Sequence, residues 1–328
     1  MALSDQFVEA HIAAWRVNLA RTFYTFTAKW PNYIFRHDPI QNLAQVLERG
    51  ELLSRTDSIG VRVVDVAAAE IVNNNDHAHS KVRMYFRPRN PTQYRIEGVM
   101  RPIERYHDAH ASMLAMMIFD ATKILTSEGV EFSTCNMQRA EVETGSSQKF
   151  FEQELDFRRI YHFGPHRDDL ITARRCAEVL LPSPFRIEAG LKRIVCRSEA
   201  ERETLIDSLS PEAKEKWREK IVSADPLRLF ERKYAFVERV YLQHDGLVAK
   251  FSPRHDGGAI KLRVKCTLLH DQTIKFESVY NPIATSPPEA NQLWRFPFEV
   301  EPGQYLVELW IEDCVSYSAV CEYTEAPF

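Results

Sequence analysis

The sequence lacks the features that mark several common protein classes. Its longest apolar run, Met113–Phe119, is far too short to cross a bilayer. The acidic residues Asp5 and Glu9 near the N-terminus are not typical of a signal peptide. The six cysteines are widely spaced, with no CxxC pair and no metal-ligand rhythm. We therefore expect a cytoplasmic protein with no membrane association, no metal, and cysteines that are reduced and mostly buried.

Familiar catalytic and nucleotide-binding motifs are also missing. The chain contains no GxGxxG, no P-loop, no GxSxG and no HExxH. Its 17 prolines outnumber its 11 glycines, which indicates fixed loops more than flexible linkers. The net charge of −4 does not mark a nucleic-acid binder, so any basic surface must be local.

One local basic and aromatic segment is present. Between Lys81 and Arg105 there are seven basic residues and two acidic ones. A short strand is predicted over Val82–Phe86, and the loop after it is held by Pro88 and Pro91. A rigid loop with arginines and aromatic rings suits phosphates and stacked bases.

A second cluster of the same kind follows later in the chain. It runs from Arg158 to Phe163 and continues with His166 and Arg167. Charge runs of this kind are usually solvated faces, and that alternative stays open here.

The pattern of apolar residues predicts three regions. We expect residues 1–30 to form a helix, over about 5–28, that docks on a mixed α/β domain over 31–225, and a second domain over 226–328. In the middle region we expect strands at 32–37, 82–86, 130–134, 177–181 and 191–196, and helices at 39–50, 113–126, 149–155, 170–176, from Ser198 and from Ser210. The segment 61–70 could be helix or strand, and 73–77 is predicted to be a loop.

Seven short alternating segments fill the C-terminal region. They lie at 236–242, 247–251, 259–268, 273–279, 293–300, 304–312 and 315–323, and turn residues separate them. This spacing predicts an antiparallel β-sandwich of immunoglobulin-like type.

Two single residues could carry chemistry. Glu178 lies inside an apolar strand segment, where a carboxylate is costly unless it is paired or faces a cleft. It could stabilise an oxocarbenium ion and hold a sugar hydroxyl, or it could form a buried ion pair with Arg174 or Arg175. His37 ends the first strand and could offer a ring nitrogen to a ribose hydroxyl, or it could be a structural histidine.

Three segments in order resemble the DarT family of nucleic-acid ADP-ribosyltransferases. Phe35–Leu43, with Leu47 and Gly50, is similar to the first strand and helix of the family. Val82–Tyr94 is similar to its aromatic-Tyr-Phe-x-Pro-Arg-x-Pro segment. Ala177–Pro182 resembles the strand that bears the catalytic glutamate. The order and spacing agree over about 31–222.

The resemblance implies an ADP-ribosyltransferase fold, an α/β (α+β) domain with a split central sheet, which binds NAD in a cleft. By position, Glu178 would be the catalytic glutamate, and the NAD pocket would include His37, Asn42, Tyr85 and Phe86. The family has an arginine for the NAD phosphates after its second helical segment. That region here reads Glu70–Asn75, so the expected phosphate ligand is Arg55 or Arg62. The expected strand-binding residues are Arg83, Arg87, Arg89 and Gln148.

The function implied is transfer of ADP-ribose from NAD to a base of single-stranded DNA or RNA. The protein would be the toxin of a toxin–antitoxin or anti-phage system. Residues 226–328 could bind its antitoxin, a trigger protein or a second copy of the chain. Two alternatives are kept: an ADP-ribosyltransferase that acts on proteins, and a nucleic-acid-binding module without activity.

Overall fold

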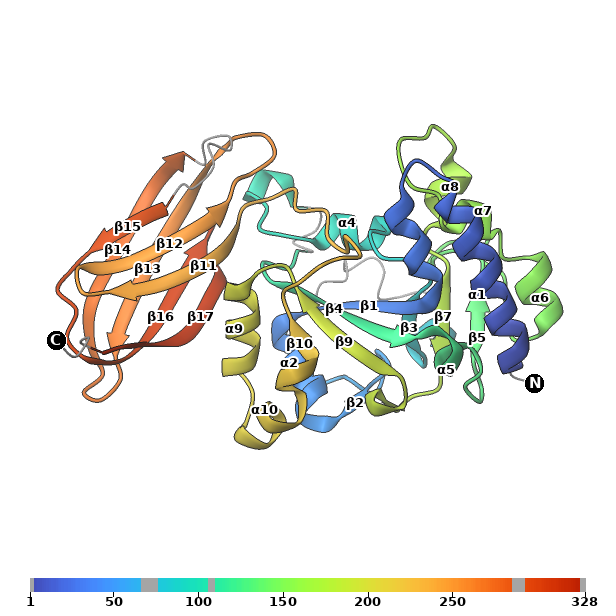
Figure 1. Cartoon of the computed structure of the whole chain (residues 1–328), viewed down its shortest axis with the longest axis horizontal. Helices are drawn as coiled ribbons and strands as arrows, with labels where there is room; N and C mark the ends of the chain where they lie inside the picture. The colour runs from blue at the N-terminus through green and yellow to red at the C-terminus, as the bar shows by residue number, and fades with distance from the viewer. Residues whose placement is uncertain (1–2, 66–75, 106–109, 285–292, 325–328) are drawn as a thin grey trace.

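The computed structural model describes residues 3–65, 76–105, 110–284 and 293–324. Within these ranges the chain forms two bodies that lie end to end (Figure 1). The first is a mixed sheet with helices around it, and the second consists of antiparallel sheets.

The first body is built on an eight-stranded sheet. In spatial order its strands are β10 (Ile221–Val222), β9 (Leu191–Cys196), β4 (Leu114–Asp120), β1 (Tyr33–Pro39), β3 (Val82–Tyr85), β7 (Glu178–Leu181), β5 (Glu131–Ser133) and β6 (Thr144–Gly145). All neighbours are antiparallel except β9 and β10. β1 pairs with β4 over its full length, but with β3 only through Phe35 and Tyr85. The sheet therefore splits beside that single pair.

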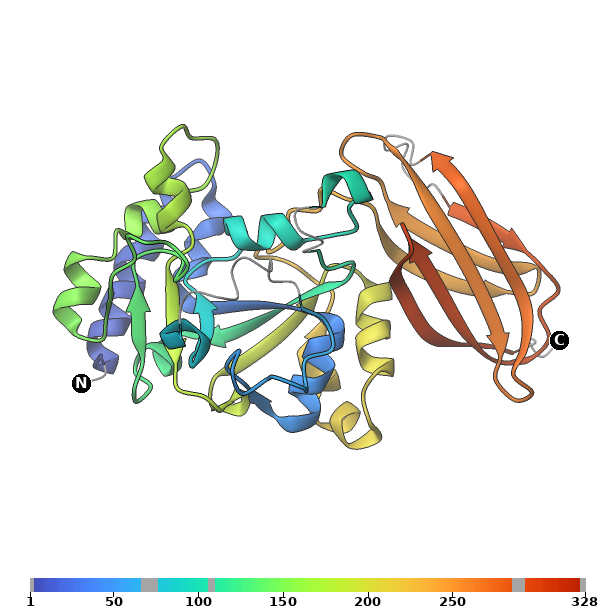
Figure 2. The ribbon, with the colours of Figure 1, turned by 180° about the vertical axis from the view of Figure 1, so that it is seen from behind.

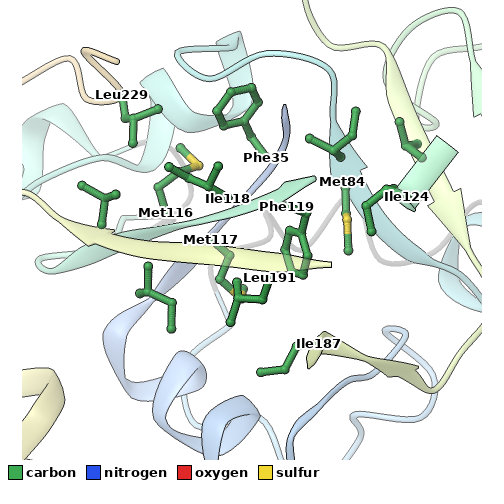
Figure 3. Packing of buried hydrophobic residues seen from close by; sticks show 14 of the residues in the cluster. Phe35, Met84, Met116, Met117, Ile118, Phe119, Ile124, Ile187, Leu191 and Leu229 are labelled. Atoms are coloured by element: carbon green, nitrogen blue, oxygen red, sulfur yellow. The ribbon is translucent and has the colours of Figure 1, made fainter. Parts of the chain in front are cut away.

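The strand β4 corrects one prediction. Residues 113–126 were expected to form a buried helix, but the apolar run is a strand, and the helix α5 (Ala121–Leu125) begins only after it. Figure 3 shows Met116 and Ile118 on one face of β4, and Met117 and Phe119 on the other. A strand that is buried on both faces carries apolar residues at every position, so its sequence shows neither the helical nor the strand period.

Helices pack around the sheet and fix its loops. They are α1 (Asp5–Ala20), α2 (Ile40–Arg49), α3 (Asp76–His79), α4 (Pro91–Ile96), α6 (Gln148–Gln153), α7 (Phe157–Ile160), α8 (Asp169–Arg174), α9 (Glu199–Asp207) and α10 (Pro211–Trp217). Short 3-10 turns lie at η1 (Thr25–Asn32), η3 (Pro102–Glu104), η4 (Ile187–Ala189) and η5 (Arg218–Lys220), and β2 (Glu51–Leu52) pairs with β8 (Phe185–Arg186). In α2, Leu43 and Leu47 are buried at helical spacing, and Gly50 ends the helix at φ 73°, a left-handed conformation that favours glycine.

The N-terminal segment packs on the first body, and its helix is shorter than expected. α1 ends at Ala20, and a 3-10 turn follows in place of the last part of the predicted helix. Trp30 is fully buried, and its indole N–H donates to the main-chain oxygen of Leu227 over 3.0 Å. Figure 2 shows α1 beside α6, α7 and α8 from behind.

Among its described residues, the second body contains the seven strands that the sequence predicts. β11 (Phe236–Gln243), β12 (Gly246–Ser252) and β15 (Leu293–Pro297) form one antiparallel sheet. β13 (Ala259–Leu268), β14 (Thr273–Ala284), β16 (Gly303–Ile311) and β17 (Cys314–Tyr323) form the other. The inner faces of the two sheets share one apolar core.

The two bodies are tied together by several hydrogen bonds. The Tyr317 hydroxyl of β17 donates to the carboxylate of Glu203 on α9 over 3.0 Å. The Glu97 carboxylate, just after α4, accepts the main-chain N–H groups of Glu231 and Arg232 at 3.0 and 2.9 Å. The segment that joins the bodies is therefore held against the end of α4.

All six cysteines are free, and four of them are buried. No helix among the described residues is long and apolar enough to span a membrane. Within the same residues, no three metal-ligating side chains gather in one place.

Candidate active site

Four polar side chains meet on one face of β1, β3 and β7. The register places Tyr85 of β3 opposite Phe35 of β1 on one side and opposite Glu178 of β7 on the other. Because strand side chains alternate between faces, Arg83 and His37 lie on the same face as this row. The split in the sheet therefore brings a carboxylate, a guanidinium, a phenol and an imidazole together.

Glu178 is the most buried member of the cluster. Its side chain has no exposed surface, and both of its oxygens accept from Arg83, at 2.8 Å from Nε and 2.5 Å from Nη2. Its main-chain N–H donates to the Ser133 hydroxyl over 3.1 Å. A carboxylate that accepts two hydrogen bonds from one guanidinium has a fixed orientation as well as a counter-ion.

The ion pair corrects the structural alternative considered from the sequence. Arg174 donates to the main-chain oxygen of Thr134, and Arg175 donates to main-chain oxygens including that of His162. Neither contacts Glu178. The partner is Arg83, which lies far away in sequence and comes close only through the pairing of β3 with β7.

Burial and charge act in opposite directions on this pair. Burial raises the pKa of Glu178, while the facing Arg83 guanidinium and a main-chain hydrogen bond from Met137 oppose the rise. Burial also disfavours the charge of Arg83, but the Glu178 carboxylate outweighs it, and the pKa of Arg83 is raised. The guanidinium therefore stays charged, and it is the main group that opposes the rise in the pKa of the buried carboxyl group.

His37 and Tyr85 form the uncharged part of the cluster. Their rings stack with centroids 5.3 Å apart and planes 10° from parallel. Burial, helped by the charges of Arg36 and Arg83, lowers the pKa of His37 to about 3. The pKa of the Tyr85 hydroxyl is raised by burial and then by Glu178. At neutral pH the imidazole is neutral and offers one donor and one acceptor, which suits a sugar hydroxyl.

A small polar layer lies behind the tyrosine. The hydroxyl of Thr92 in α4 is 4.0 Å from the Cys176 sulfur and accepts from the Asn136 amide over 3.4 Å. Burial, with the nearby Glu178 charge, raises the pKa of the Cys176 thiol to about 11. The thiol is therefore protonated at neutral pH and is not a nucleophile.

The comparison with protein families decides the identity of the first body. Residues 35–227 match the family described as "ssDNA thymidine ADP-ribosyltransferase, DarT". This range is more than half of the chain and contains all four residues of the cluster. The chain belongs to the DarT family. It is an ADP-ribosyltransferase, and NAD is the substrate that supplies the ADP-ribose.

Solved structures of DarT proteins resemble the chain at low identity. The structure "Thermus sp. 2.9 DarT in complex with ADP-ribosylated ssDNA" is 18% identical, with a TM-score of 0.49, and the likeness covers 59% of this chain and 93% of that one. "Thermus sp. 2.9 DarT in complex with NAD+" is 16% identical, with a TM-score of 0.47 and coverage of 60% and 97%. "Thermosipho africanus DarTG in complex with ADP-ribose" is 17% identical, with a TM-score of 0.43 and coverage of 64% and 53%. No curated protein matches the chain.

Two residues predicted for the NAD pocket lie outside the four-residue cluster. Asn42 in α2 braces a loop, since its amide donates to the main-chain oxygen of Val64 over 2.7 Å and accepts the N–H groups of Val63 and Val64. The Arg55 guanidinium donates two hydrogen bonds to the Asp65 carboxylate, over 2.7 and 3.3 Å. Both residues therefore order the segment that runs toward residue 65. The predicted departure at 70–75 lies outside the described residues.

A separate hollow beside α2 gathers more cations. It is lined by Arg36, Arg49 and Arg62 together with Asn42, and also by the carboxylates of Asp38 and Glu51. Arg36 pairs with Asp38 over 2.6 Å. Arg62, the alternative phosphate ligand in the sequence, lines this hollow, whereas Arg55 does not.

Two residues of the β3 loop point into the protein. Phe86 is 1% exposed and packs on Phe132, Phe151 and Phe157, on the opposite face of the strand from Tyr85. Phe86 therefore cannot line a pocket that Tyr85 faces, and this prediction is wrong. Strand alternation separates the two adjacent aromatic residues.

Arg87 is also 1% exposed, which corrects its predicted contact with nucleic acid. Its guanidinium donates to the main-chain oxygens of Pro88, Ile160 and His162 and lies 4.9 Å from the Trp30 ring. A guanidinium that is enclosed in this way holds the loop in place and is not available to a strand in solvent.

Arg89 and Gln148 lie nearer to the surface. Arg89 is partly exposed, pairs with Glu231 over 2.6 Å and lies 4.8 Å from the Phe163 ring. Its φ of 53° is a left-handed conformation, held by a hydrogen bond from its N–H to the Gln93 side chain. Gln148 is exposed at the first turn of α6.

Sequence reasoning missed the supporting residues Ser133, Thr92 and Asn136. Ser133 lies inside the strand predicted at 130–134, and the signal for Thr92 was the Asn90-Pro91 pair that begins α4, where the Asn90 side chain caps the helix. Ser133 accepts from Glu178, and Thr92 contacts Cys176 and Asn136, only because of how β5, β7 and α4 pack. That arrangement is not visible in any local pattern.

Proposed function

We propose that this protein transfers ADP-ribose from NAD to the thymine base of a thymidine in single-stranded DNA. The observation that carries the proposal is the fully buried, arginine-held carboxylate of Glu178, on the same face as His37 and Tyr85 within the matched family range. The family description names both the strand type and the base, which favours DNA over RNA.

The chemistry assigns one role to each residue. The bond between C1′ of the nicotinamide ribose and the nicotinamide nitrogen breaks, and positive charge develops on the sugar. Glu178 accepts a hydrogen bond from a ribose hydroxyl and stabilises that charge, since an ionised carboxylate in a dry site acts strongly at short range. A thymine ring nitrogen attacks C1′ and loses its proton, and nicotinamide leaves.

The neighbours orient the sugar and the carboxylate. Neutral His37 holds a hydroxyl of the same ribose, and Tyr85, stacked on it, forms the wall beside nicotinamide. Arg83 aligns Glu178 and is therefore removed from the proposed strand-binding set. Arg62 beside α2 is the proposed ligand for the NAD phosphates. Arg89 and Gln148 remain as proposed contacts to the strand.

The catalytic role of Glu178 is tested with two Glu→Gln variants, each of which keeps the shape of the side chain. Glu178→Gln removes the charge, and we expect transfer to fall by about 10²- to 10³-fold. The matched control is Glu201→Gln, which removes a second buried carboxylate, paired with Arg197, on α9. If both variants lose transfer equally when rates are compared per folded molecule, the loss is not specific to Glu178, and the role of Glu178 is refuted.

The biological role we propose is that of a cytoplasmic toxin. Modified thymine cannot pair normally, so expression of the active chain should arrest bacterial growth, whereas the Glu178→Gln chain should be tolerated. Equal toxicity of the two chains would contradict the proposal.

We further propose that residues 226–328 form an immunoglobulin-like sandwich and a docking surface for an antitoxin protein. The sandwich is hydrogen-bonded to α9 through Tyr317 and Glu203, and the segment that leads into it is hydrogen-bonded to Glu97 at the end of α4. A candidate antitoxin should bind the full chain with higher affinity than a chain with charge reversals on the outer face of β14. Equal affinity would place the partner elsewhere.

A further inference from the structure

A groove lies where the N-terminal segment packs on α7, outside the cluster around Glu178. α1 and η1 precede the family match, which begins at residue 35. Between them and α7 there is a hollow of about 520 Å³. We call it the α1–α7 groove. Most of its wall is formed by rings, those of Trp15, Phe23, Tyr24, Tyr161, His162 and Phe163.

The aromatic rings of the groove pack on one another in edge-to-face and tilted arrangements. Trp15 lies 5.7 Å from Tyr161, and Tyr24 lies 4.7 Å from Phe163 with the planes at 73°. Phe23 touches Tyr24 edge-on, yet 92% of Phe23 is exposed. A phenylalanine left this open at the mouth of an aromatic hollow presents a free face on which another ring can stack.

The charged side chain that lines the groove is a cation, and the carboxylates of Glu152 and Asp156 line an adjoining hollow that shares Trp15 and Arg158. No carboxylate lines the groove, and the chain has no acidic residue between Glu9 and Asp38. In that stretch Arg16, Arg21 and Lys29 are exposed. Arg158 lines the groove itself, is exposed, and forms no ion pair with any described residue. In a chain of net charge −4, this local excess of positive charge favours an anionic occupant.

The groove is connected to the active site through the loop after β3. β3 ends at Tyr85, and two residues later Arg87 donates to the main-chain oxygens of Ile160 and His162. Arg89 then lies over Phe163, a wall of the groove. The loop after β3 therefore joins the strand that carries Tyr85 to one wall of the groove.

We propose that the α1–α7 groove binds an unstacked base of the single strand that flanks the acceptor nucleotide, with Arg158 on a phosphate next to that base. Rings that stack and a cation that pairs with phosphate are the two parts of a single-strand binding site. The proposal rests on the proposed function for its substrate. It adds a second subsite, built by the N-terminal segment that lies outside the family range.

The test uses two variants of the groove with matched controls. Phe23→Ala removes the exposed ring, and Arg158→Gln removes the unpaired charge. Ile103→Ala is the control for the first, because Ile103 is also 92% exposed but lies on η3. Arg193→Gln is the control for the second, because Arg193 is exposed on β9.

The measurement is the KM of ADP-ribose transfer for a long and a short acceptor. With an oligonucleotide of about 12 nucleotides, each groove variant should raise KM on the order of 10-fold, and the controls should leave it unchanged. With a trinucleotide that contains one thymidine, and for NAD itself, the groove variants should match the wild type. An unchanged KM for the long acceptor, or an equal rise for both acceptors, would overturn the proposal.

A binding assay separates this proposal from the proposed function. The full chain that carries Glu178→Gln is titrated into a fluorescent oligothymidylate, with and without Phe23→Ala. Weaker binding upon Phe23→Ala supports the groove even if the wild type modifies no oligonucleotide. If the wild type transfers ADP-ribose but neither Phe23→Ala nor Arg158→Gln weakens binding, the proposed function is supported and the proposed base site in the groove is refuted.

Discussion

The Arg83–Glu178 pair makes a prediction that combines stability, pH and catalysis. Arg83→Met keeps most of the aliphatic length of the side chain and removes the guanidinium. Glu178 is fully buried and Arg83 is 24% exposed, so the variant leaves a carboxylate in the interior without its counter-ion. Loss of one partner of a buried pair costs about 3 to 5 kcal/mol of unfolding free energy while the other stays charged.

Protonation of Glu178 limits this loss of unfolding free energy at low pH, and it therefore sets how the stability of the variant changes with pH. Burial already raises the pKa of Glu178 above 4.5 with Arg83 present, and removal of Arg83 raises it further. A carboxyl group whose pKa is raised in the folded state binds more protons in the folded protein than in the unfolded chain. Its contribution to the free energy of unfolding is therefore complete below about pH 4.5, and it is lost as the pH rises toward the folded-state pKa. The stability of the variant should therefore fall relative to the wild type by up to about 1.4 kcal/mol per pH unit in that window.

The assay is urea unfolding at pH 5 and pH 8 for the wild type, Arg83→Met, Glu178→Gln and the double variant. We expect a large loss for Arg83→Met at pH 8, a smaller loss at pH 5, and little cost of Arg83→Met when Glu178 is already glutamine. Transfer by Arg83→Met should recover as the pH rises, because more Glu178 is ionised. Equal losses at both pH values, with additive effects in the double variant, would refute the ion-pair account.

The remaining predictions concern the cofactor wall, the N-terminal anchor and the acceptor strand. Because the pKa of His37 is about 3, the KM for NAD should show no histidine titration between pH 5 and 8, and His37→Ala should raise that KM; a titration near 6.5 that disappears in the variant would contradict this. Trp30→Phe leaves the buried oxygen of Leu227 without its donor and should cost about 1 to 3 kcal/mol in thermal or urea unfolding; an unchanged midpoint would show that the anchor is not needed. Binding of oligothymidylate should weaken steeply with salt, and Arg89→Gln should reduce the slope of log K against log salt by about one; an unchanged slope would remove Arg89 from the interface.

Patterns that repeat within one element could be predicted from the sequence. The seven strands of the second body alternate apolar and polar residues and are separated by turns, so their existence follows from local spacing. The helix α2 and the Ser198 cap of α9 were predictable for the same reason. β4 was not, because a central strand buried on both faces has no period.

The candidate site was predictable one residue at a time but not as an arrangement. Glu178 was identified because a carboxylate interrupts an apolar strand, and its register next to Tyr85 followed from no sequence signal. The arginines of the β3 loop were indistinguishable in sequence. Arg83 turns toward Glu178 and Arg87 toward main-chain oxygens because strand alternation and the path of the loop decide the direction of each side chain.

The most direct test of the central claim is mass spectrometry of single-stranded oligonucleotides after incubation with NAD and the full chain. We predict that a DNA oligonucleotide with one thymidine gains the mass of one ADP-ribose and releases one nicotinamide. The same oligonucleotide without thymidine, its RNA counterpart, and reactions with the Glu178→Gln chain should remain unmodified. Undiminished modification by Glu178→Gln, or nicotinamide release with no adduct on any oligonucleotide, would contradict the account.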